Sequence, residues 1–461
     1  MKQNKFFIIG ITLVATLGGL LFGYDTAVIS GAVDPLKAFF QLDAEHYGNL
    51  ATFYHGATVS SALLGCILGG AISGIFATRF GRKKSLIIAS ILFFISAVGS
   101  GYPEMIFFNS GTAISTLLVS FNVYRIIGGI GVGLASAICP MYIAEMAPAE
   151  IRGKLVSWNQ FAIIFGMLIV YFVNYFIVFG KDPVWINATG WRQMFLSESL
   201  VAATFGILLF LVPETPRYLA LIHNDNKALS ILTKINGVEK AKEILAEIKE
   251  TVHEKVEHVL TYGWKVLIIG ILLSVFQQAV GINVVLYYAP TIFKGLGFGN
   301  DAAMWQTVIM GIVNIIFTLV AIFTVDKFGR KPLLIIGSTG MAIGMFAIGA
   351  LAHFQIIGVS TLIFIVIYTA AFMMSWGPIC WVLISEIFPN TIRGKAVAIA
   401  VAAQWIANFV VSSTFPSLEA FSITFTYVLY GVMSVLSALF VWKMVPETKG
   451  KTLEDMSKLW K

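Results

Sequence analysis

Long apolar stretches recur along this chain and alternate with short polar loops. A helix needs about 20 predominantly apolar residues to cross the hydrocarbon core of a bilayer. Twelve stretches reach this length, so the pattern predicts twelve membrane-spanning helices. They lie near residues 6–30, 51–76, 85–103, 118–142, 156–179, 196–212, 265–290, 303–325, 333–352, 359–385, 396–416 and 423–445.

The composition excludes an ordinary soluble protein. Hydrophobic residues make up 58% of the 461 residues and charged residues only 12%, with a mean hydropathy of +0.85. Soluble domains carry about 25% charged residues. The first apolar stretch continues to Ser30 without the small-residue cleavage site of a signal peptide, so we expect it to remain as a span. The expected class is an all-α integral membrane protein.

The net charge of +7 reflects topology. If both termini are cytoplasmic, the outer loops contain only Lys37, Lys181, Arg192 and Lys294, and the other loop Lys and Arg residues face the cytoplasm. That distribution follows the positive-inside rule for this orientation. The basic excess is therefore a topology signal, and we expect no nucleic-acid partner.

The chain shows no pattern typical of a metal or cofactor site. Cys66, Cys139 and Cys380 fall in three separate predicted spans without paired spacing, and the six His residues are scattered. The glycines from Gly129 to Gly133 resemble a dinucleotide loop, but they lie inside a span with no strand before them. We interpret them as small residues that allow close helix packing.

Amide and phenol side chains interrupt the seventh predicted span. The stretch FQQAVGINVVLYYAP, Phe276 to Pro290, contains polar groups that hydrocarbon cannot satisfy. An ideal helix would point Gln278 and Asn283 about 140° apart, so both reach one ligand only if the helix loosens, for which Gly281 is well placed. Neutral hydrogen-bonding groups in a broken span suit a neutral, polyhydroxylated solute. The alternative is that these groups only bond neighbouring helices.

Three ionisable residues fall within predicted spans: Asp25, Arg125 and Glu198. Placing such a residue in the bilayer costs about 2.5 to 3.5 kcal/mol on insertion scales, which makes function the default expectation. An Asp near an Arg ionises easily, whereas an Asp in apolar surroundings binds a proton more readily. A carboxylate whose surroundings alternate can therefore carry a proton. The alternative is a static pair of Asp25 and Arg125 that only joins two helices.

Three loop motifs occur twice in the same order, which indicates a duplicated six-helix unit. Two parallel repeats are a transporter architecture, with the substrate near the bilayer midplane between the halves. The motif pairs are RFGRKKS (Arg79–Ser85) with KFGRKPL (Lys327–Leu333), EMAPAEIRGK (Glu145–Lys154) with EIFPNTIRGK (Glu386–Lys395), and PETPR (Pro213–Arg217) with PETKG (Pro446–Gly450).

A long polar segment separates the two halves. Between Thr215 and His258, apolar residues recur at helical spacing with Lys and Glu between them, which predicts short amphipathic helices on the cytoplasmic side. We divide the chain into a first half (1–214), a helical linker (215–262), a second half (263–448) and a short cytoplasmic tail (449–461).

These motifs resemble those of the sugar porter family of the major facilitator superfamily. The resemblance covers essentially the whole chain, from GGLLFGYDTAVISG at Gly18–Gly31 through FQQAVGINVVLYYAP to PETKGKTLE. It implies twelve transmembrane helices in two six-helix pseudo-repeats with a cytoplasmic helical linker. It also implies a proton-coupling role for Asp25 and its partner Arg125, because family members that only facilitate diffusion typically lack the acid. Glu198 is either a member of this network or an interfacial residue.

The resemblance also assigns residues to a sugar site. A sugar presents hydroxyls at its edge and apolar faces, which amides and indoles recognise. Met167 stands where close members of the family have glutamine, which leaves the identity of the sugar open. The implied sugar contacts are Gln160, Gln277, Gln278, Asn283, Asn314, Trp381 and Gln404; the implied cavity lining is Phe22, Met167, Tyr287 and Trp405, for which core packing is an equal alternative.

The charged loop motifs are implied to form cytoplasmic gates. Simple anchoring at the membrane surface is the alternative for each basic residue taken singly. The implied gate residues are Arg79, Glu145, Arg152, Arg217, Arg330, Glu386 and Arg393.

The expected function is uptake of a pentose, D-xylose first, together with protons by alternating access. We expect a monomer in a bacterial inner membrane, no cofactor, and no enzymatic activity. One rival is a proton-independent facilitator for a hexose such as glucose, with Asp25 merely structural. The other is a transporter-like sugar sensor, which the short stretch after the last span disfavours, because such sensors need a cytoplasmic signalling extension.

Overall fold

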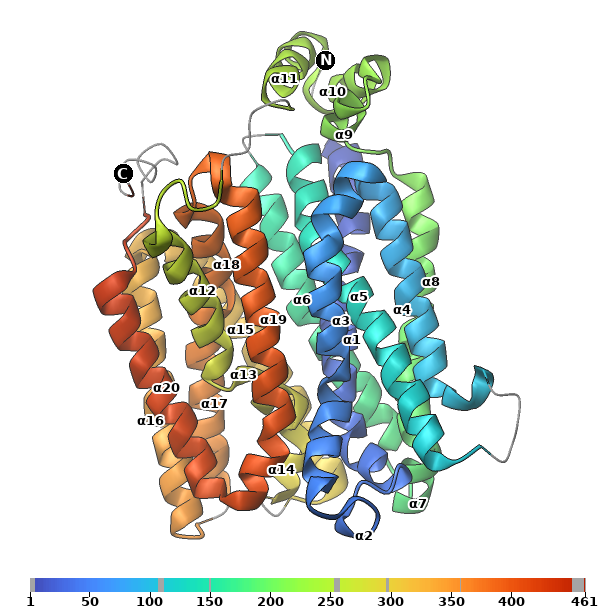
Figure 1. Ribbon diagram of the computed structural model, residues 1–461, viewed down its shortest axis with the longest axis vertical. Helices are drawn as coiled ribbons and strands as arrows, with labels where there is room; N and C mark the ends of the chain where they lie inside the picture. Colours follow the sequence, from blue (N-terminus) through green and yellow to red (C-terminus); the bar gives the residue numbers. More distant parts are fainter. Residues whose placement is uncertain are drawn as a thin grey trace.

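The structure, a computed structural model, describes residues 5–106, 112–148, 151–252, 258–295, 298–356, 358–449 and 460. This part of the chain is built from helices and contains no strand (Figure 1). Twelve helical segments are long and apolar enough to cross a membrane, and each overlaps a predicted span. The all-α membrane fold is therefore confirmed. Most of the predicted tail, 449–461, lies outside the described residues.

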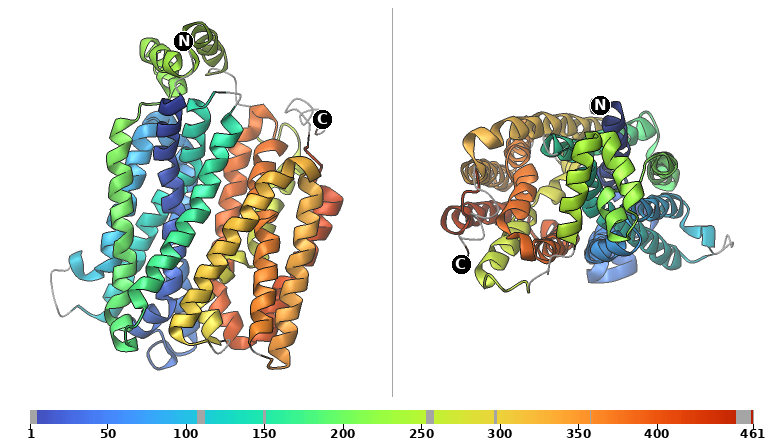
Figure 2. Two further views of the ribbon diagram at one scale, coloured as in Figure 1. Left: turned by 180° about the vertical axis from the view of Figure 1, so that it is seen from behind. Right: turned by 90° about the horizontal axis from the view of Figure 1, so that it is seen from above.

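The spans form two six-span bundles that stand side by side (Figures 1 and 2). The first bundle contains α1 (Lys5–Phe39), α3 (Ala51–Arg79), α4 (Arg82–Gly101), α5 (Ile114–Met146), α6 (Arg152–Val178) and α8 (Trp191–Leu211). The second contains α12 (Trp264–Ala279), α13 (Ile282–Tyr287), α14 (Ala289–Gly295), α15 (Asn300–Phe328), α16 (Arg330–His353), α17 (Val359–Met373), α18 (Trp376–Ile387), α19 (Asn390–Phe421) and α20 (Ile423–Met444). Two spans of the second bundle are therefore broken: α12 is followed by α13, and α17 by α18.

Several helices extend beyond their predicted bounds. The first span continues to Phe39, so Lys37, expected in an outer loop, lies in the last turn of α1. Short helical turns fill the connections at α2 (Ala44–Tyr47), η1 (Gly48–Leu50), η2 (Pro103–Ile106), α7 (Pro183–Trp185) and η3 (Ile186–Gly190).

Three amphipathic helices join the two bundles, as the polar segment predicts: α9 (Pro216–Leu221), α10 (Asp225–Asn236) and α11 (Val238–Val252). Their apolar faces form a small core of Leu219, Ala228, Leu232, Ala241 and Leu245. They contact α1 and α5 and lie over the first bundle (Figure 2). We call this end of the molecule the linker end and the opposite end the far end.

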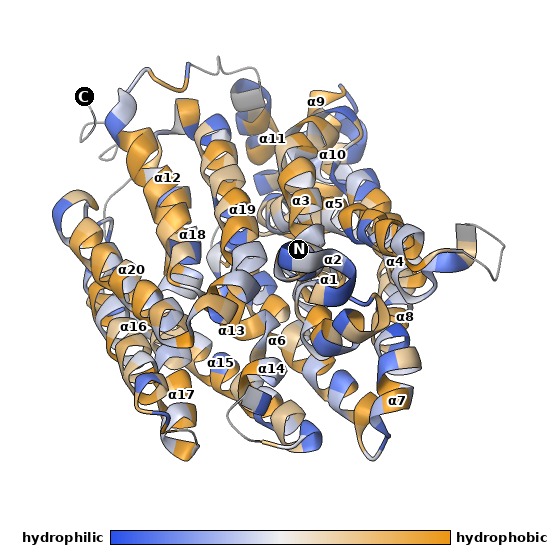
Figure 3. Ribbon diagram, turned by 60° about the horizontal axis from the view of Figure 1, so that its bottom comes forward, coloured by the Kyte–Doolittle hydropathy of each residue, from blue (hydrophilic) through white to orange (hydrophobic). Residues whose placement is uncertain are grey.

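Apolar residues make up most of the membrane helices, and polar residues gather at the ends and on the linker (Figure 3). Within the first bundle, α3 and α5 approach closely through glycines. A Cβ atom placed on Gly129 would lie 1.8 Å from the carbonyl oxygen of Ala62, and one on Gly65 would lie 2.0 Å from that of Ile126. The interpretation of Gly129–Gly133 as a packing stretch agrees with this geometry.

The two bundles meet along a few helix pairs. The α3 helix packs against α19, and α6 packs against α15. At the far end, α1 of the first bundle also contacts α13 and α14 of the second. These contacts bring α1, α3 and α6 on one side close to α13, α15 and α19 on the other, and most of the predicted central residues lie on these helices.

Candidate functional site

The predicted amide stretch lies where α12 gives way to α13. Gly281 occupies this break with φ +91°, in the left-handed region that favours glycine. The break lets the Nδ2 of Asn283 donate a hydrogen bond to the Oε1 of Gln278 at 2.5 Å. The Nε2 of Gln278 donates in turn to the Oε1 of Gln277 at 3.2 Å. The three amides therefore form one hydrogen-bonded chain across the broken span.

Three more predicted residues have buried polar atoms without a hydrogen-bond partner among the described residues. The atoms are the amide oxygen and nitrogen of Asn314 on α15, the Oε1 of Gln404 on α19 and the indole Nε1 of Trp405 on α19. Buried polar atoms are nearly always bonded, so these atoms are available to a polar ligand. The ring of Trp405 also meets that of Phe22, with centroids 5.7 Å apart, which joins the two bundles through an aromatic contact.

The remaining predicted sugar residues lie on α6, α13 and α18. Gln160 and Trp381 are partly buried, and Met167 is buried. Tyr287 is buried, and its hydroxyl accepts a hydrogen bond from the Nδ2 of Asn408 at 3.3 Å. Asn408 was not among the predicted residues, although it lies one helical turn after Gln404 on α19.

The three predicted ionisable residues gather inside the first bundle. The Nη1 of Arg125 donates to the Oδ1 of Asp25 at 2.6 Å, and its Nη2 donates to the backbone oxygen of Asp25 at 3.2 Å. Asp25, Arg125 and Glu198 are each at most 1% exposed. Neither carboxylate oxygen of Glu198 has a hydrogen bond among the described residues. The ring of Phe195 lies 5.1 Å from the guanidinium carbon of Arg125. The cluster thus contains one buried cation and two buried carboxyl groups.

Arg82 organises the linker end of the first bundle. Its Nη2 donates to the Oε1 of Glu145 at 2.7 Å, and its Nη1 donates to the carbonyl of Ala77 at 3.0 Å. The carboxylate of Glu214 accepts the backbone N–H groups of Arg82 and Lys83. This network joins the loop after α3 to the end of α5 and the end of α8.

The second bundle repeats this network. The Nη2 of Arg330 donates to the Oε1 of Glu386 at 3.0 Å. The carboxylate of Glu447 accepts the backbone N–H groups of Arg330 and Lys331. A hydroxyl is added here, because the Oγ1 of Thr448 donates to the Oε2 of Glu386 at 2.6 Å. The duplicated motifs of the sequence therefore build two equivalent networks.

The two equivalent glutamates differ in electrostatics. Burial raises the pKa of Glu214 above its usual value, and the backbone N–H groups that it accepts only partly offset this effect. Glu447 is less buried, so the N–H groups of Lys449, Lys331 and Arg330 outweigh burial and lower its pKa. Desolvation disfavours the carboxylate, and hydrogen bonds to it favour the carboxylate. The same fold position thus holds two carboxyl groups with opposite shifts.

Of the other predicted gate residues, three are exposed. Arg79 is exposed and has no ion pair within the part of the chain that the structure describes; its guanidinium lies 5.9 Å from the centre of the Phe80 ring. Arg152 and Arg217 are also exposed. The Nε of Arg393 donates to the carbonyl of Phe388 at 3.3 Å.

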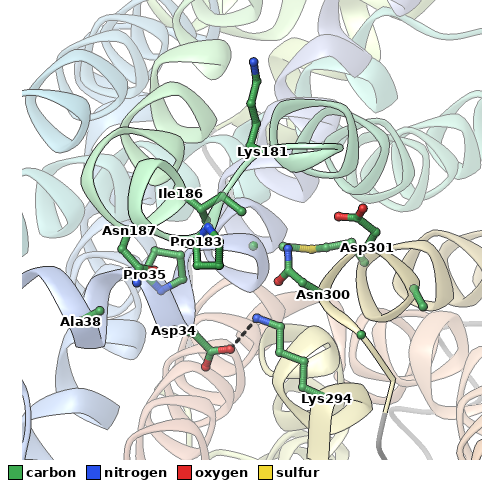
Figure 4. A pocket seen from close by; sticks show the side chains of 14 residues that line it. Asp34, Pro35, Ala38, Lys181, Pro183, Ile186, Asn187, Lys294, Asn300 and Asp301 are labelled. Carbon is green, nitrogen blue, oxygen red and sulfur yellow. Dashed lines mark hydrogen bonds and ion pairs between the residues drawn. The ribbon is translucent and has the colours of Figure 1, made fainter.

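Polar contacts join the two bundles at the far end. The Nζ of Lys294 on α14 lies 2.8 Å from the Oδ2 of Asp34 on α1 (Figure 4). Thr291 donates to the same carboxylate at 3.0 Å. Asp34 and Lys294 also line a cavity of about 720 Å³ that lies between the bundles. A second cross-bundle bond joins Ser417 to Thr52 at 3.0 Å. Of the ion pairs given above, those at the linker end stay within one bundle, whereas this one joins the two.

Comparison with known proteins decides the family. The sequence profile of the family described as "Sugar (and other) transporter" matches residues 11–460. The chain belongs to this family. It is 55% identical to the D-xylose-proton symporter of Escherichia coli, over 100% of this chain and 97% of that protein. It is 38% identical to the glucose facilitated diffusion protein of Zymomonas mobilis, over 100% and 99%. Among solved structures, it is similar to the inward open conformation of the xylose transporter XylE from E. coli, with a TM-score of 0.88, 55% identity, and coverage of 98% and 100%.

The chain thus belongs to a transporter family, and its central groups are of two chemical kinds. The site combines neutral amides and indoles from the second bundle with a charged cluster in the first. Amides can hydrogen-bond hydroxyls, and an indole can cover an apolar sugar face. The charged cluster can take up and release a proton.

Some residues of this transporter were missed at the sequence level. Arg82, Glu214 and Glu447 complete the linker-end networks but were not proposed as gate residues. The repeated motif contained the signal, because aligning Arg79–Ser85 with Lys327–Leu333 places Arg82, and not Arg79, opposite Arg330. The far-end pair of Asp34 and Lys294 had no comparable signal, since it joins α1 to α14 and neither residue lies in one of the three repeated loop motifs.

Proposed function

We propose that this protein carries D-xylose into the cell together with a proton by alternating access. The observation that supports this proposal most strongly is the buried cluster of Asp25, Arg125 and Glu198, which lies in the same membrane interior as the amide and indole groups of the second bundle. A solute carrier that is coupled to protons needs both a solute site and a buried group that binds a proton.

The charge balance of the cluster gives it a proton-binding role. Arg125 can neutralise only one carboxylate, and a buried uncompensated charge costs several kcal/mol. One proton on Asp25 or Glu198 makes the cluster neutral. Arg125 holds Asp25 at 2.6 Å, so a rearrangement that opens this pair exchanges the cation for a proton. We assign proton coupling to these three residues.

The sugar site is proposed to centre on the available atoms of Asn314, Gln404 and Trp405. The amide chain of Gln278 and Asn283 adds donors and acceptors from the broken span. We further assign contact roles to Gln160, Gln277 and Trp381, and lining roles to Phe22, Met167 and Tyr287.

D-xylose is the substrate that we propose because the E. coli symporter of that sugar is 55% identical over the full chain. Met167 has a thioether at a position where an amide side chain would add a hydrogen-bonding group. The affinity for a sugar with more hydroxyl groups therefore depends on the other residues of the proposed site. The facilitator alternative rests on the 38% identity to the glucose facilitated diffusion protein. The higher identity and the buried acid favour symport.

We propose that the chain is a monomer in the inner membrane of a bacterial cell. In the proposed orientation the linker end lies in the cytoplasm. The far end then faces outward and is closed by Asp34, Thr291 and Lys294. The proposed gate residues lie at the linker end, where Arg82, Glu145, Arg330 and Glu386 form the charged networks, and where Arg79, Arg152, Arg217 and Arg393 provide the surrounding positive charge.

External pH in lightly buffered, de-energised cells that overexpress the chain tests this function. D-xylose, D-glucose, L-arabinose and D-galactose are added in turn. Proton symport of D-xylose predicts alkalinisation after D-xylose addition and a smaller or absent response to the others. Equilibration of labelled sugar without any pH change would favour the facilitator instead.

A further inference from the structure

The two broken spans of the second bundle touch each other at their breaks. The first break follows α12, at Val280 and Gly281, and the second follows α17, at Met374 and Ser375. A helix that ends inside a membrane needs donors for the backbone carbonyls of its last turn. At these two breaks, a side chain of each span supplies a hydrogen bond to the backbone of the other.

The first tie runs from the tenth span to the seventh. Tyr368 on α17 is fully buried, and its hydroxyl donates to the carbonyl oxygen of Val280 at 2.8 Å. That carbonyl lies directly before Gly281, whose φ of +91° ends the helical course of the span. The Tyr368 hydroxyl therefore bonds the backbone of the seventh span at its break.

The second tie runs from the seventh span to the tenth. The Nε2 of Gln277 on α12 donates to the carbonyl oxygens of Trp376 at 3.0 Å and of Gly377 at 3.2 Å, the first two residues of α18. Gln277 is 3% exposed. Its amide nitrogen is therefore already bonded, in contrast to the amide of Asn314, which has no partner among the described residues.

The four helix segments that meet here lead to opposite ends of the molecule. From the first break, α13 and α14 run to the far end, where Lys294 pairs with Asp34 of the first bundle. From the second break, α18 runs to the linker end, where Glu386 pairs with Arg330. The two ties therefore lie between the segments that lead to the far end and the segment that leads to the linker end.

We propose that Tyr368 and Gln277 are positioning residues that join the two breaks into one joint, so that opening of the far end by α13 and α14 is transmitted to α18 at the linker end. This proposal builds on the alternating access described under Proposed function. It gives a physical reason why the two ends are not open together. It also gives Gln277 a role between helices in addition to its place beside the sugar.

A wedge at the far end tests the joint. Gly56 on α3 faces the backbone of α19, and a Cβ atom at this position would lie 2.0 Å from the carbonyl oxygen of Ser413. Gly56→Leu therefore forces the bundles apart at the far end. Lys154→Cys and Lys395→Cys, on the exposed first turns of α6 and α19, carry spin labels that report the width of the linker end. The distance is measured by electron paramagnetic resonance on the full chain in nanodiscs, without sugar.

The joint predicts that the wedge shortens the linker-end distance in the parent background and that Tyr368→Phe abolishes at least half of this shift. Tyr430→Phe is the matched control: the Tyr430 ring packs on the same break, 2.9 Å from a Cβ placed on Gly281, but its hydroxyl has no partner among the described residues. It should leave the shift unchanged. A shift that is equal in the parent and in Tyr368→Phe, or absent from both, contradicts the joint.

A second measurement separates this proposal from the transport proposal. D-xylose affinity and counterflow rate are measured for Tyr368→Phe, Gln277→Met and the double variant. Loss of one neutral hydrogen bond corresponds to about a fivefold change, so each single variant should slow counterflow about fivefold, and Tyr368→Phe should bind D-xylose within about twofold of the parent. If the two bonds act together, counterflow by the double variant should be no slower than counterflow by the slower single variant. If the two fold-changes multiply in the double variant, the bonds act independently. If the chain binds no sugar but the spin-label response holds, the transport proposal fails and the joint stands.

Discussion

The two bundles repeat one framework but differ in chemistry at their centres. At the linker end, Arg82 with Glu145 and Arg330 with Glu386 form equivalent ion pairs. At the centre, the first bundle has Asp25 and Arg125 as a buried charged pair. The second bundle instead has broken spans lined with neutral amides.

This difference suggests a division of labour. Duplication gives two similar bundles, and the same kind of network stabilises the linker end of each. The centres have diverged, so that the proposed proton-binding cluster lies in one bundle and most of the neutral groups proposed to bind the solute lie in the other. Coupling between the two then depends on contacts that cross from one bundle to the other, such as that of Phe22 with Trp405.

The largest expected effect on stability comes from removing the buried guanidinium of Arg125. Arg125→Met leaves the Asp25 carboxylate buried without its partner, which costs about 3 to 5 kcal/mol. Thermal unfolding in detergent should show a correspondingly lower Tm. Arg125→Met combined with Asp25→Asn removes both charges and should recover most of the loss. Equal losses in the single and double variants would mean that the pair is not the source of the effect.

The linker-end networks should be sensitive to Arg82 and not to Arg79. Arg82→Gln removes hydrogen bonds to a charged and partly buried partner, which contribute about 1.5 to 3 kcal/mol. Its equivalent, Arg330→Gln, should lower the free energy of unfolding by a similar amount. Arg79→Gln, an exposed residue of the same motif, should change it by less than about 0.5 kcal/mol. A larger effect at Arg79 than at Arg82 would break the equivalence of the two bundles.

The neutral centre of the second bundle is tested by Asn314→Leu. The amide has no protein partner among the described residues, so its removal should weaken D-xylose binding about tenfold, or about 1.4 kcal/mol, without lowering Tm. Asn408→Leu is the contrast, because the Asn408 amide already bonds Tyr287 and Ser412 and its loss should lower Tm. Isothermal titration and thermal unfolding on the same samples give both numbers. A fall in Tm with unchanged affinity for Asn314→Leu would support a role in helix packing alone.

The smallest expected effect separates Glu447 from Glu214. The lowered pKa of Glu447 means that its carboxylate stabilises the folded state above the ordinary pKa of a glutamate and loses this contribution as pH falls through the lowered value. Glu447→Gln should therefore lower Tm at pH 7, with a difference from the parent that shrinks below about pH 4.5. The raised pKa of Glu214 means that its ionised form is disfavoured in the folded state, so Glu214→Gln should lower Tm less at pH 7 or raise it. Thermal unfolding between pH 4 and 7 checks the order of the two variants, and a reversed order would contradict these opposite shifts.

The sequence predicted the fold well because membrane spans and repeats are carried by local patterns. Apolar length alone located all twelve spans. The paired motifs predicted the two bundles, and Gly281 indicated the loosened seventh span. The second break, between α17 and α18, was not predicted, although Gly377 and Pro378 directly after it are a strong local helix-breaking signal inside the predicted span.

The site was predicted less completely because its contacts join distant parts of the chain. Asp25 and Arg125 are 100 residues apart, and only the cost of burying each suggested that they meet. The use of the Gln277 amide by the backbone of α18 depends on how two broken spans cross, which no residue pattern reveals. The Asp34 and Lys294 pair at the far end depends in the same way on how the two bundles pack against each other.

Active accumulation and passive exchange of D-xylose, measured on the same proteoliposomes containing Asp25→Asn, address proton coupling itself. The proposed role of Asp25 predicts that this variant loses accumulation driven by a proton gradient and retains counterflow of labelled D-xylose. Accumulation at the level of the parent protein would contradict proton coupling through the buried cluster.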